Sequence, residues 1–380
     1  MQRWFSALVL LLAAAKLPAA EGELAAALAR IRAVQPLGAG HREAVAAAKV
    51  AAAAPASELP QILAAMDGAN PIAENWLRGA AEAVAQRGSK QLPALALESF
   101  LADTKHSPRG RRLAYELIAA VDATAESRLI PTLLDDPSLE LRRDAVAQVL
   151  TAAANAEGKA ALPLFAKALH HARDLDQIKT ASVKLKELGS PGDLPRHMGY
   201  VMQWQLIGPF DNVEDAGWDV PYPPEAAVDL QAAHPGQKGP VKWITHATSD
   251  EYGLVDLTKA LDKHKGAVTY AFVEFVADRE QPCELRLTSP NANKIWLNGK
   301  LLQANHVYHA NDPLDQYTAR GTLRKGPNAI LLKVCQNEQE DDWAQKWEFR
   351  LRVCDAIGTA ILAANRPERI SAFGVQGAGK

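Results

Sequence analysis

The fold of the second half of the chain rests on residues 294–301, Lys-Ile-Trp-Leu-Asn-Gly-Lys-Leu. The pair Asn298-Gly299 lies between two apolar runs, which is the pattern of a two-residue β-hairpin. A type I′ turn needs positive φ at both central residues, and Asn and Gly adopt that conformation at low cost. Similar apolar runs recur around it, at positions 268–277, 283–288, 328–335 and 347–354. We therefore expect the hairpin to be one part of an all-β sandwich.

The last of these runs shows the strand pattern most clearly. From Trp347 to Val353 apolar and charged residues alternate, as in a strand with one buried and one wet face. The run at 268–277 is apolar throughout, as in a central strand covered on both sides. Strand markers of this kind total about nine, which predicts an antiparallel jelly-roll β-sandwich. Five charged residues are expected on one polar sheet face with cross-strand ion pairs: Glu284, Arg286, Glu348, Arg350 and Arg352.

The first half has a different pattern. Residues 21–189 are rich in Ala and Leu and have helical periodicity. A weak internal repeat recurs about every 32 residues, and each copy follows a proline that can begin a helix. The copies are Leu77-Arg78-x-x-Ala81, Gly110-Arg111-x-x-Ala114 and Leu141-Arg142-x-x-Ala145.

These copies resemble HEAT-like helical repeats over residues 60–155, and the flanking helical stretches fit that pattern loosely. Such repeats stack helix pairs into a solenoid, so the resemblance implies a surface that contacts a protein partner. An irregular α-helical bundle without a ligand is the alternative. The fold class predicted for the whole chain is therefore multidomain α plus β, with a HEAT-like solenoid followed by a jelly-roll sandwich.

The N-terminus has the pattern of a secretory signal. Arg3 precedes an uninterrupted apolar run at positions 4–15, and small residues follow up to Ala20. A helix of that length spans about 18 Å, which is too short for a hydrocarbon core of about 30 Å. We expect cleavage near Ala20, an exported protein (periplasmic, cell-envelope or extracellular) and a mature chain without a membrane span. An uncleaved N-terminal anchor helix is the alternative.

Charge and cysteine content narrow the function classes. The chain has 42 basic and 44 acidic residues, so no basic excess indicates nucleic-acid binding. The three cysteines, Cys283, Cys335 and Cys354, form no CxxC pair, so neither structural zinc nor a redox motif is indicated. Their pairing is left open, because an odd number in an exported protein leaves at least one thiol free.

The glycines and prolines between Gly189 and Pro195 interrupt regular secondary structure and separate the two halves. The predicted organisation is a signal peptide at 1–20, a helical region at 21–189, a linker at 190–199, a sandwich at 200–362 and a flexible tail at 363–380. Inside the sandwich, residues 211–240 contain five prolines and read as a long loop. A loop of that length is usually functional or wrapped over the core.

Two motifs of the second half carry a resemblance to a known fold family. They are Ile-Trp-Leu-Asn-Gly-Lys at 295–300 and Gly-Pro-Asn-Ala-Ile-Leu-Leu-Lys-Val at 326–334. In this order they resemble galactose-binding-like β-sandwiches, among them the non-catalytic sugar-binding domains of family 2 glycoside hydrolases. The resemblance covers about residues 200–360. It implies a carbohydrate-binding module, and it allows a structural calcium ion for which the residues themselves give no support.

A sugar site needs an aromatic platform and a few polar side chains. Three aromatic residues and three polar residues in loops are the candidates for such a site: Trp218, Tyr222 and Trp343 for stacking, and Asp211, Asn212 and Asp342 for hydroxyl contacts. The alternative is that the tryptophans cap the sandwich core. The acidic run at 338–342 has no EF-hand spacing and reads as a solvated loop.

The sequence nominates no catalytic residue and no metal ligand. His306 and His309 form an HxxH in a loop, without the helical HExxH pattern of zinc enzymes. His170 and His171 are neighbours on a helix and point about 100° apart, so they cannot chelate one ion. Nothing in the sequence nominates a catalytic pair of carboxylates, and no nucleophile elbow, phosphate loop or dinucleotide fingerprint is present.

We therefore expect an exported, non-catalytic binding protein. Its sandwich would recognise carbohydrate, and its helical repeats would contact a protein. A structural or scaffold protein of the envelope that binds only protein is the first alternative. A glycoside hydrolase-like enzyme with unrecognised catalytic acids is the second. The identity of the ligand or partner and the oligomeric state are not encoded in any recognisable pattern.

Overall fold

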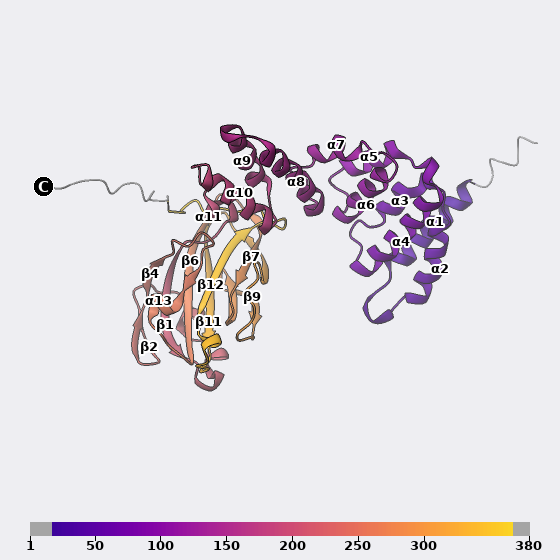
Figure 1. Ribbon diagram of the computed structural model, residues 1–380. Helices are drawn as coiled ribbons and strands as arrows, with labels where there is room; N and C mark the ends of the chain where they lie inside the picture. The colour runs from indigo at the N-terminus through magenta and orange to yellow at the C-terminus, as the bar shows by residue number, and fades with distance from the viewer. Residues whose placement is uncertain (1–16, 368–380) are drawn as a thin grey trace, which may run out of the picture. The chain divides into compact units, whose positions relative to one another are not determined.

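The computed structural model describes residues 17–367. The predicted apolar signal run at 4–15 lies outside these residues, and the first described helix already begins at Leu17. The chain divides between Ala181 and Ser182 into a helical unit, drawn in indigo to magenta, and a unit dominated by strands, drawn mainly in orange to yellow (Figure 1). Within the described residues no helix has the length and hydropathy that a membrane span requires.

Short antiparallel helices joined by tight turns build the helical unit. They are α1 Leu17–Arg32, α2 His41–Ala52, α3 Leu59–Ala64, α4 Pro71–Arg87, α5 Ala94–Ala102, α6 Pro108–Ala119, α7 Ala125–Leu129, α8 Leu139–Asn155, α9 Ala161–His171 and α10 Leu175–Glu187, which runs past the division. The 3-10 turns between them are η1 Pro36–Gly38, η2 Ala56–Glu58, η3 Ser89–Gln91, η4 Ile130–Thr132 and η5 Gly158–Ala160.

The repeated motif lies on α4, α6 and α8, as its spacing predicts. Two of these helices begin with the proline itself behind a side-chain cap: Asn70 accepts from two backbone N–H groups of α4, and Ser107 accepts from one of α6. The apolar motif positions are buried in the core: Leu77 and Ala81 on α4, Ala114 on α6, and Leu141 and Ala145 on α8, where a Leu and the Ala four residues later share one face. The helical character of this half is thereby confirmed.

Arginines in the motif or directly after it link each of these helices to the next helix but one. Arg78 on α4 contacts Glu116 on α6 at 2.6 Å, Arg112 on α6 contacts Asp144 on α8, and Arg143 on α8 contacts Asp176 on α10 at 2.6 Å. We call this series the arginine ladder. The links recur with a step of one helix pair, with Arg78 at the arginine position of the motif and Arg112 and Arg143 at the position after it.

The second unit is an antiparallel β-sandwich, as predicted. Its six-stranded sheet has the order β4-β1-β6-β11-β8-β9, and its four-stranded sheet has the order β10-β7-β12-β5. The strands are β1 Gln203–Asp211, β4 Ile244–Ala247, β5 Val255–Asp256, β6 Ala267–Ala277, β7 Gln281–Thr288, β8 Ala292–Leu297, β9 Lys300–Asn305, β10 Tyr317–Leu323, β11 Gly326–Gln336 and β12 Glu348–Cys354. Apolar side chains of both sheets meet in one core that includes Trp204, Phe275, Leu285, Ile330 and Leu351. The finer jelly-roll assignment stays a prediction.

The predicted hairpin joins β8 to β9. Asn298 and Gly299 have φ of 52° and 78°, the positive values that the turn requires. Asn298 also contacts the second sequence motif: its Oδ1 accepts from the N–H of Ala329 at 3.0 Å, and its Nδ2 donates to Oδ1 of Asn328 at 2.9 Å. The two motifs quoted from the sequence therefore hold each other in place.

Residues 211–240 differ from the unstructured loop that their prolines predicted. They form η6 Val213–Trp218, α12 Pro223–Ala226 and the two strands β2 Ala233–Gly236 and β3 Gly239–Lys242, which pair with each other. Prolines occupy the first turn of α12, where a helix tolerates them. The segment covers the outer face of the six-stranded sheet, where Trp218 and Val241 pack against residues of β1, β6, β8 and β11. This cover explains why β6 is apolar on both faces.

The predicted polar face on the four-stranded sheet is present, with Glu284 and Arg352 buried and the other three residues half-buried. Arg286 and Arg352 are register partners on β7 and β12, so two positive charges face each other. Asp315 lies between them and accepts from Arg286 at 2.9 Å and from Arg352 at 2.7 Å, while Glu284 accepts from Arg286 at 2.6 Å. The two arginines are therefore joined by Asp315, a loop residue that the strand pattern did not identify.

The remaining elements border the sandwich. They are α11 Leu194–Met198, inside the predicted linker, α13 Leu257–Leu261 and η7 Asp342–Ala344. Residues 363–367, assigned to the flexible tail, are attached to the sandwich: the N–H of Ala364 donates to Val276 O at 2.8 Å, and Arg366 donates to Tyr200 O at 2.6 Å. The three cysteines are free buried thiols, and burial raises the pKa of Cys335 to about 12 and of Cys283 and Cys354 to about 11.

A buried ion pair gives a test of the helical unit. The side chains of Arg111 and Asp136 are 1% and 3% exposed and form two hydrogen bonds, of 2.7 and 2.5 Å. Arg111→Ala leaves a buried carboxylate without its cation, so we expect a loss of about 3–5 kcal/mol in the free energy of unfolding. Arg78→Ala removes a solvent-exposed link of the arginine ladder and should cost about 1 kcal/mol or less. Urea unfolding followed by circular dichroism measures both, and equal losses in the two variants would contradict this account.

Candidate binding rim of the sandwich

The site residues predicted from the sequence gather at one end of the sandwich. Register pairs place the end of β1 at Asp211 beside the start of β6 and the end of β11, with the start of β8 and the end of β9 next in line. The connections that leave these strand ends are residues 211–222, 306–312 and 337–346. We call this end the rim. The sequence thus located all six predicted residues on neighbouring loops, but their exposure differs from one to the next.

Two of the predicted aromatic residues lie inside the rim. Trp218 is 8% exposed; its ring is stacked on His306 at 4.3 Å, and the ammonium of Lys294 lies 4.4 Å from its centroid. Tyr222 is half-buried and stacked on Phe210 at 4.7 Å. Both rings pack against the outer face of the sheet. They cap the sheet, which is the alternative that the sequence left open.

Two of the predicted polar residues also serve the fold. Asn212 is fully buried, and its Nδ2 donates to the hydroxyl of Tyr308 at 3.0 Å and to Gln336 O at 3.1 Å. Its Oδ1 has no hydrogen-bond partner among the described residues. Asp211 is exposed, but its backbone oxygen accepts from the hydroxyl of Tyr222 at 2.6 Å, which ties the loop to the strand end.

The third aromatic residue is different. Trp343 is 62% exposed, and Asp342 beside it is exposed as well. The edge of the Trp343 ring system contacts His309, with the ring centroids 5.0 Å apart and the planes at 80°. His309 is itself hydrogen-bonded to Oδ1 of Asn337 at 3.0 Å. Trp343 therefore stands in solvent on a support that fixes its position.

Hydrogen bonds hold the loop that carries Trp343. Lys265 donates to Ala344 O at 2.8 Å, and the Gln345 side-chain amide donates to the backbone oxygens of Glu340 and Asp341 at 2.6 and 2.9 Å. These bonds reach the main chain on both sides of the ring. An exposed aromatic side chain on a loop restrained in this way loses little freedom when a ligand binds.

Sequence reasoning missed a polar cluster beside the buried Trp218. Asp215 accepts from the hydroxyl of Tyr308 at 2.5 Å and contacts Nε2 of His306 at 2.6 Å. Burial, followed by the hydrogen bond to Asp215, raises the pKa of Tyr308 well above its usual value. The HxxH spacing was the available signal, but its two histidines turn to different partners. Among the described residues no three His, Cys, Asp or Glu side chains converge as a metal ion would require.

The cluster is held in a strained turn. Glu214 and Asp215 have φ of 55° and 61°, a left-handed conformation that non-glycine residues adopt at a cost. The backbone N–H of Glu214 donates to the carboxylate of Glu338 on the loop that leads to Trp343. This bond joins two loops of the rim that lie more than a hundred residues apart in the sequence.

A buried lysine anchors the segment beneath the rim. Lys333 on β11 is fully buried, and its ammonium donates to the backbone oxygens of Trp218 and Val220 at 3.1 and 2.8 Å and to the Glu225 carboxylate at 2.9 Å. The Tyr270 hydroxyl donates to the same carboxylate at 2.5 Å. Burial lowers the pKa of Lys333, and the charge of Glu225 opposes that shift. We call this group the lysine anchor.

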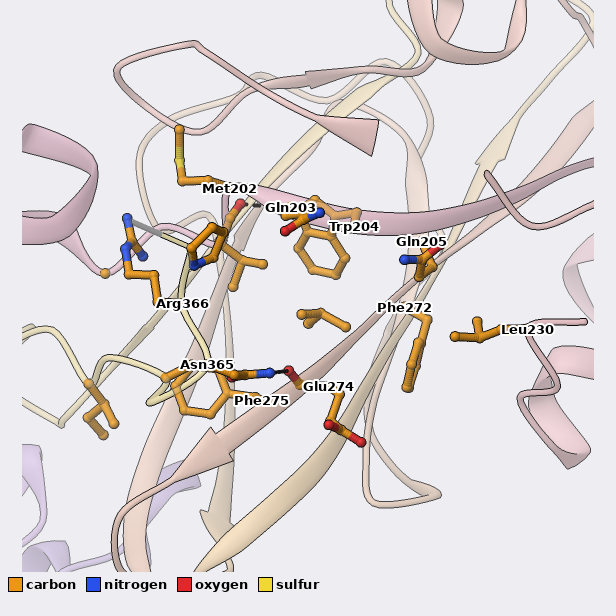
Figure 2. A pocket seen from close by; sticks show the side chains of 16 residues that line it. Met202, Gln203, Trp204, Gln205, Leu230, Phe272, Glu274, Phe275, Asn365 and Arg366 are labelled. Atoms are coloured by element: carbon orange, nitrogen blue, oxygen red, sulfur yellow. Dashed lines mark hydrogen bonds between the residues drawn. The ribbon is translucent and has the colours of Figure 1, made fainter. Parts of the chain in front are cut away.

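The unit has a second concave feature away from the rim. A cavity of about 240 Å³ lies at the start of β1, between that strand and β6. We call it the notch. Figure 2 shows Gln203 and Gln205 from β1 facing Phe272 and Glu274 from β6, with Asn365 hydrogen-bonded to the backbone of Glu274. Its small size suits one compact ligand. It lies at the opposite end of β1 from Asp211, so it is separate from the rim.

Comparison with known proteins gives little guidance. No family model matches the chain, and no curated protein is detectably similar to it. Among solved structures, a family 35 carbohydrate binding module from Clostridium thermocellum is similar at 14% identity over 23% of this chain and 72% of that chain, with a TM-score of 0.17. A likeness at that TM-score supports no conclusion about fold or ligand. Function must therefore be inferred from the residues of the chain itself.

The lysine anchor gives the second test. Lys333→Met keeps the volume but leaves the Glu225 carboxylate without its cation and Val220 O without its donor, so we expect a loss of about 3–5 kcal/mol in the free energy of unfolding. The double variant Lys333→Met/Glu225→Gln removes the orphaned charge and should recover part of that loss. Urea unfolding monitored by tryptophan fluorescence measures both. A single variant as stable as the natural chain, or a double variant less stable than the single one, would contradict the role of the anchor.

Proposed function

We propose that this protein is an exported, non-catalytic binding protein whose sandwich recognises carbohydrate at the rim. The observation that carries the proposal is Trp343, which is 62% exposed and yet held in place by His309 and by the hydrogen bonds of its loop. Large aromatic side chains are mostly buried in folded proteins. An exposed one on a restrained loop is best explained by a ligand that covers it.

The chemistry around Trp343 fits a sugar. A pyranose ring has an apolar C–H face that packs on a flat aromatic ring, and its hydroxyls need acceptors and donors at the edge. Asp342 supplies a carboxylate next to the ring, and Asp341 and Gln339 follow on the same loop. Hydrogen bonds already hold the rim loops together in the absence of a ligand, which lowers the entropy cost of binding.

We place binding rather than catalysis at the rim. Asp215, His306 and Tyr308 lie beside Trp218, and the Asp215 carboxylate is engaged by His306 Nε2 and by the Tyr308 hydroxyl. A glycosidase would need two carboxylates facing each other across a cleft. The hydrolase alternative remains open to an activity assay on the ligand that binds.

For the helical half we propose a HEAT-like solenoid that contacts a protein partner. The arginine ladder supports it, because three successive links repeat with the step of one helix pair. For the whole chain we propose export, supported by the signal-like residues 1–20 and by a charge balance that favours neither nucleic acid nor anionic membrane. A scaffold that binds only protein is the alternative to carbohydrate recognition.

The test is carbohydrate binding by the mature chain, first over a broad glycan array and then by calorimetry with the glycan that binds. Trp343→Ala should lower the affinity at least tenfold, about 1.4 kcal/mol, while Trp343→Phe should retain part of it because a smaller flat ring remains. Circular dichroism checks that each variant is folded.

Two variants serve as matched controls. Leu301→Ala removes another exposed apolar side chain of the sandwich, and Gln203→Ala alters the notch; neither should change the affinity. A loss with Gln203→Ala and none with Trp343→Ala would move the site to the notch. No binding to any glycan would overturn carbohydrate recognition and favour the scaffold alternative.

A further inference from the structure

An apolar groove runs between α2 and α4 in the helical unit. It has a volume of about 570 Å³. Val45, Ala48, Lys49 and Ala52 of α2 line one wall, and the other wall is formed by Ile72, Asn75, Trp76, Gly79 and Ala80 of α4. On each helix these residues share one face over about two turns, or roughly 11 Å of helix axis. Apart from Lys49 and Asn75, every side chain that lines the groove is apolar.

Gly79 lies in the middle of α4, where glycine is the least favourable residue after proline. Internal packing does not explain it, because a Cβ added at Gly79 would meet no atom within 4 Å. Gly110 on α6 makes a useful contrast: a Cβ there would lie 3.3 Å from the backbone oxygen of Leu63, so the packing around that glycine is tight. At Gly79 the missing side chain keeps open space in the groove.

The charge at the groove has one sign. Lys49 is its single charged lining residue, and no ion pair joins Lys49 to any described residue. His41, at the start of α2, contacts the ring of Trp76 with the centroids 5.5 Å apart. Two acidic residues of α4 are paired with arginines, Glu74 with Arg109 and Glu82 with Arg78, and Glu43 of α2 does not line the groove. An occupant with negative charge beside an apolar stripe would complement this surface.

We propose that the groove binds an amphipathic helix of a partner protein, with about two turns of apolar residues against Trp76 and Gly79 and an acidic residue opposite Lys49. Helix-in-groove recognition of this kind reads residues spaced three and four apart. The absence of a side chain at Gly79 lets the backbone of the incoming helix approach α4. The inference rests on the proposed protein-binding role of the helical half and assigns that role to one surface.

Two synthetic peptides of 18 residues supply the probe. Both carry Leu at helical spacing on one face; one has Glu along the flank and the other has Lys at the same positions. Fluorescence anisotropy of each labelled peptide is measured against the full chain. We expect the acidic peptide to bind at least tenfold more tightly than the basic one. Equal affinities, or no binding of the acidic peptide, would overturn the proposal.

Variants of the chain locate the binding. Gly79→Leu fills the groove and should weaken the acidic peptide at least tenfold, whereas Ala96→Leu adds the same side chain at an exposed position of α5 and should change nothing. Gly79→Ala should raise the melting temperature, since alanine favours the helix, while weakening the peptide. Lys49→Glu should reverse the preference between the two peptides. An unchanged affinity in Gly79→Leu would exclude the groove.

The outcomes separate this inference from the proposed function. If the acidic peptide binds but neither Gly79→Leu nor Lys49→Glu alters its affinity, the helical half binds protein through another surface and only the groove is wrong. Glycan binding is measured in parallel on Gly79→Leu, which should keep the natural affinity because the rim is untouched. Loss of both activities together would indicate that Gly79→Leu is misfolded. Gly79→Ala then tests the groove without that defect, because its melting temperature should rise while its peptide affinity falls.

Discussion

The buried ammonium of Lys333 is the interaction on which the second unit depends. Alone, a lysine inside a sheet would be costly to bury, because its charge loses the solvation of water. Here the cost is offset by two backbone oxygens and a carboxylate, all from residues 218–225. The same segment that satisfies the charge is thereby fixed across the outer face of the six-stranded sheet. Burial of Lys333 and order in the covering segment require each other.

This cover determines what the rim can present. Trp218 and Tyr222 form a layer between the sheet and the loops, and the hydrogen bonds of Asn212 and Asp215 connect that layer to Tyr308. Trp343 stands beyond the layer, supported by His309 from the same loop as Tyr308. The rim thus has a buried aromatic base and one exposed aromatic ring. A rigid base under a single exposed ring is the arrangement that a small, specific binding surface needs.

Much of this architecture was predictable from local sequence. The Asn298-Gly299 turn, the period-two pattern of β12 and the helical first half follow from backbone preferences that act over a few residues. The location of the candidate site was also predictable, because loop aromatics and acids stand at the ends of strands. Exposure was not: whether Trp218 or Trp343 is covered depends on contacts with residues more than thirty positions away, and no local pattern carries that information.

Long-range bridges account for the other differences. Asp315 neutralises two opposed arginines from a loop with no strand pattern of its own, and Glu338 joins the loop of Glu214 across the rim. The five prolines of residues 211–240 predicted a loop, but two of them begin the short helix α12 and two lie in the paired strands β2 and β3. In each case the sequence supplied the groups, and only the fold determined which of them meet.

The most direct test of the central claim is fluorine NMR of the chain labelled with 5-fluorotryptophan, titrated with a mixture of soluble glycans. The chain has eight tryptophans, and each resonance is assigned by a single Trp→Phe variant. The account predicts that the resonance of Trp343 shifts on ligand addition, while that of the covered Trp218 changes little. A glycan that shifts Trp218 or another buried tryptophan and leaves Trp343 unmoved would contradict the assignment of the rim as the binding surface.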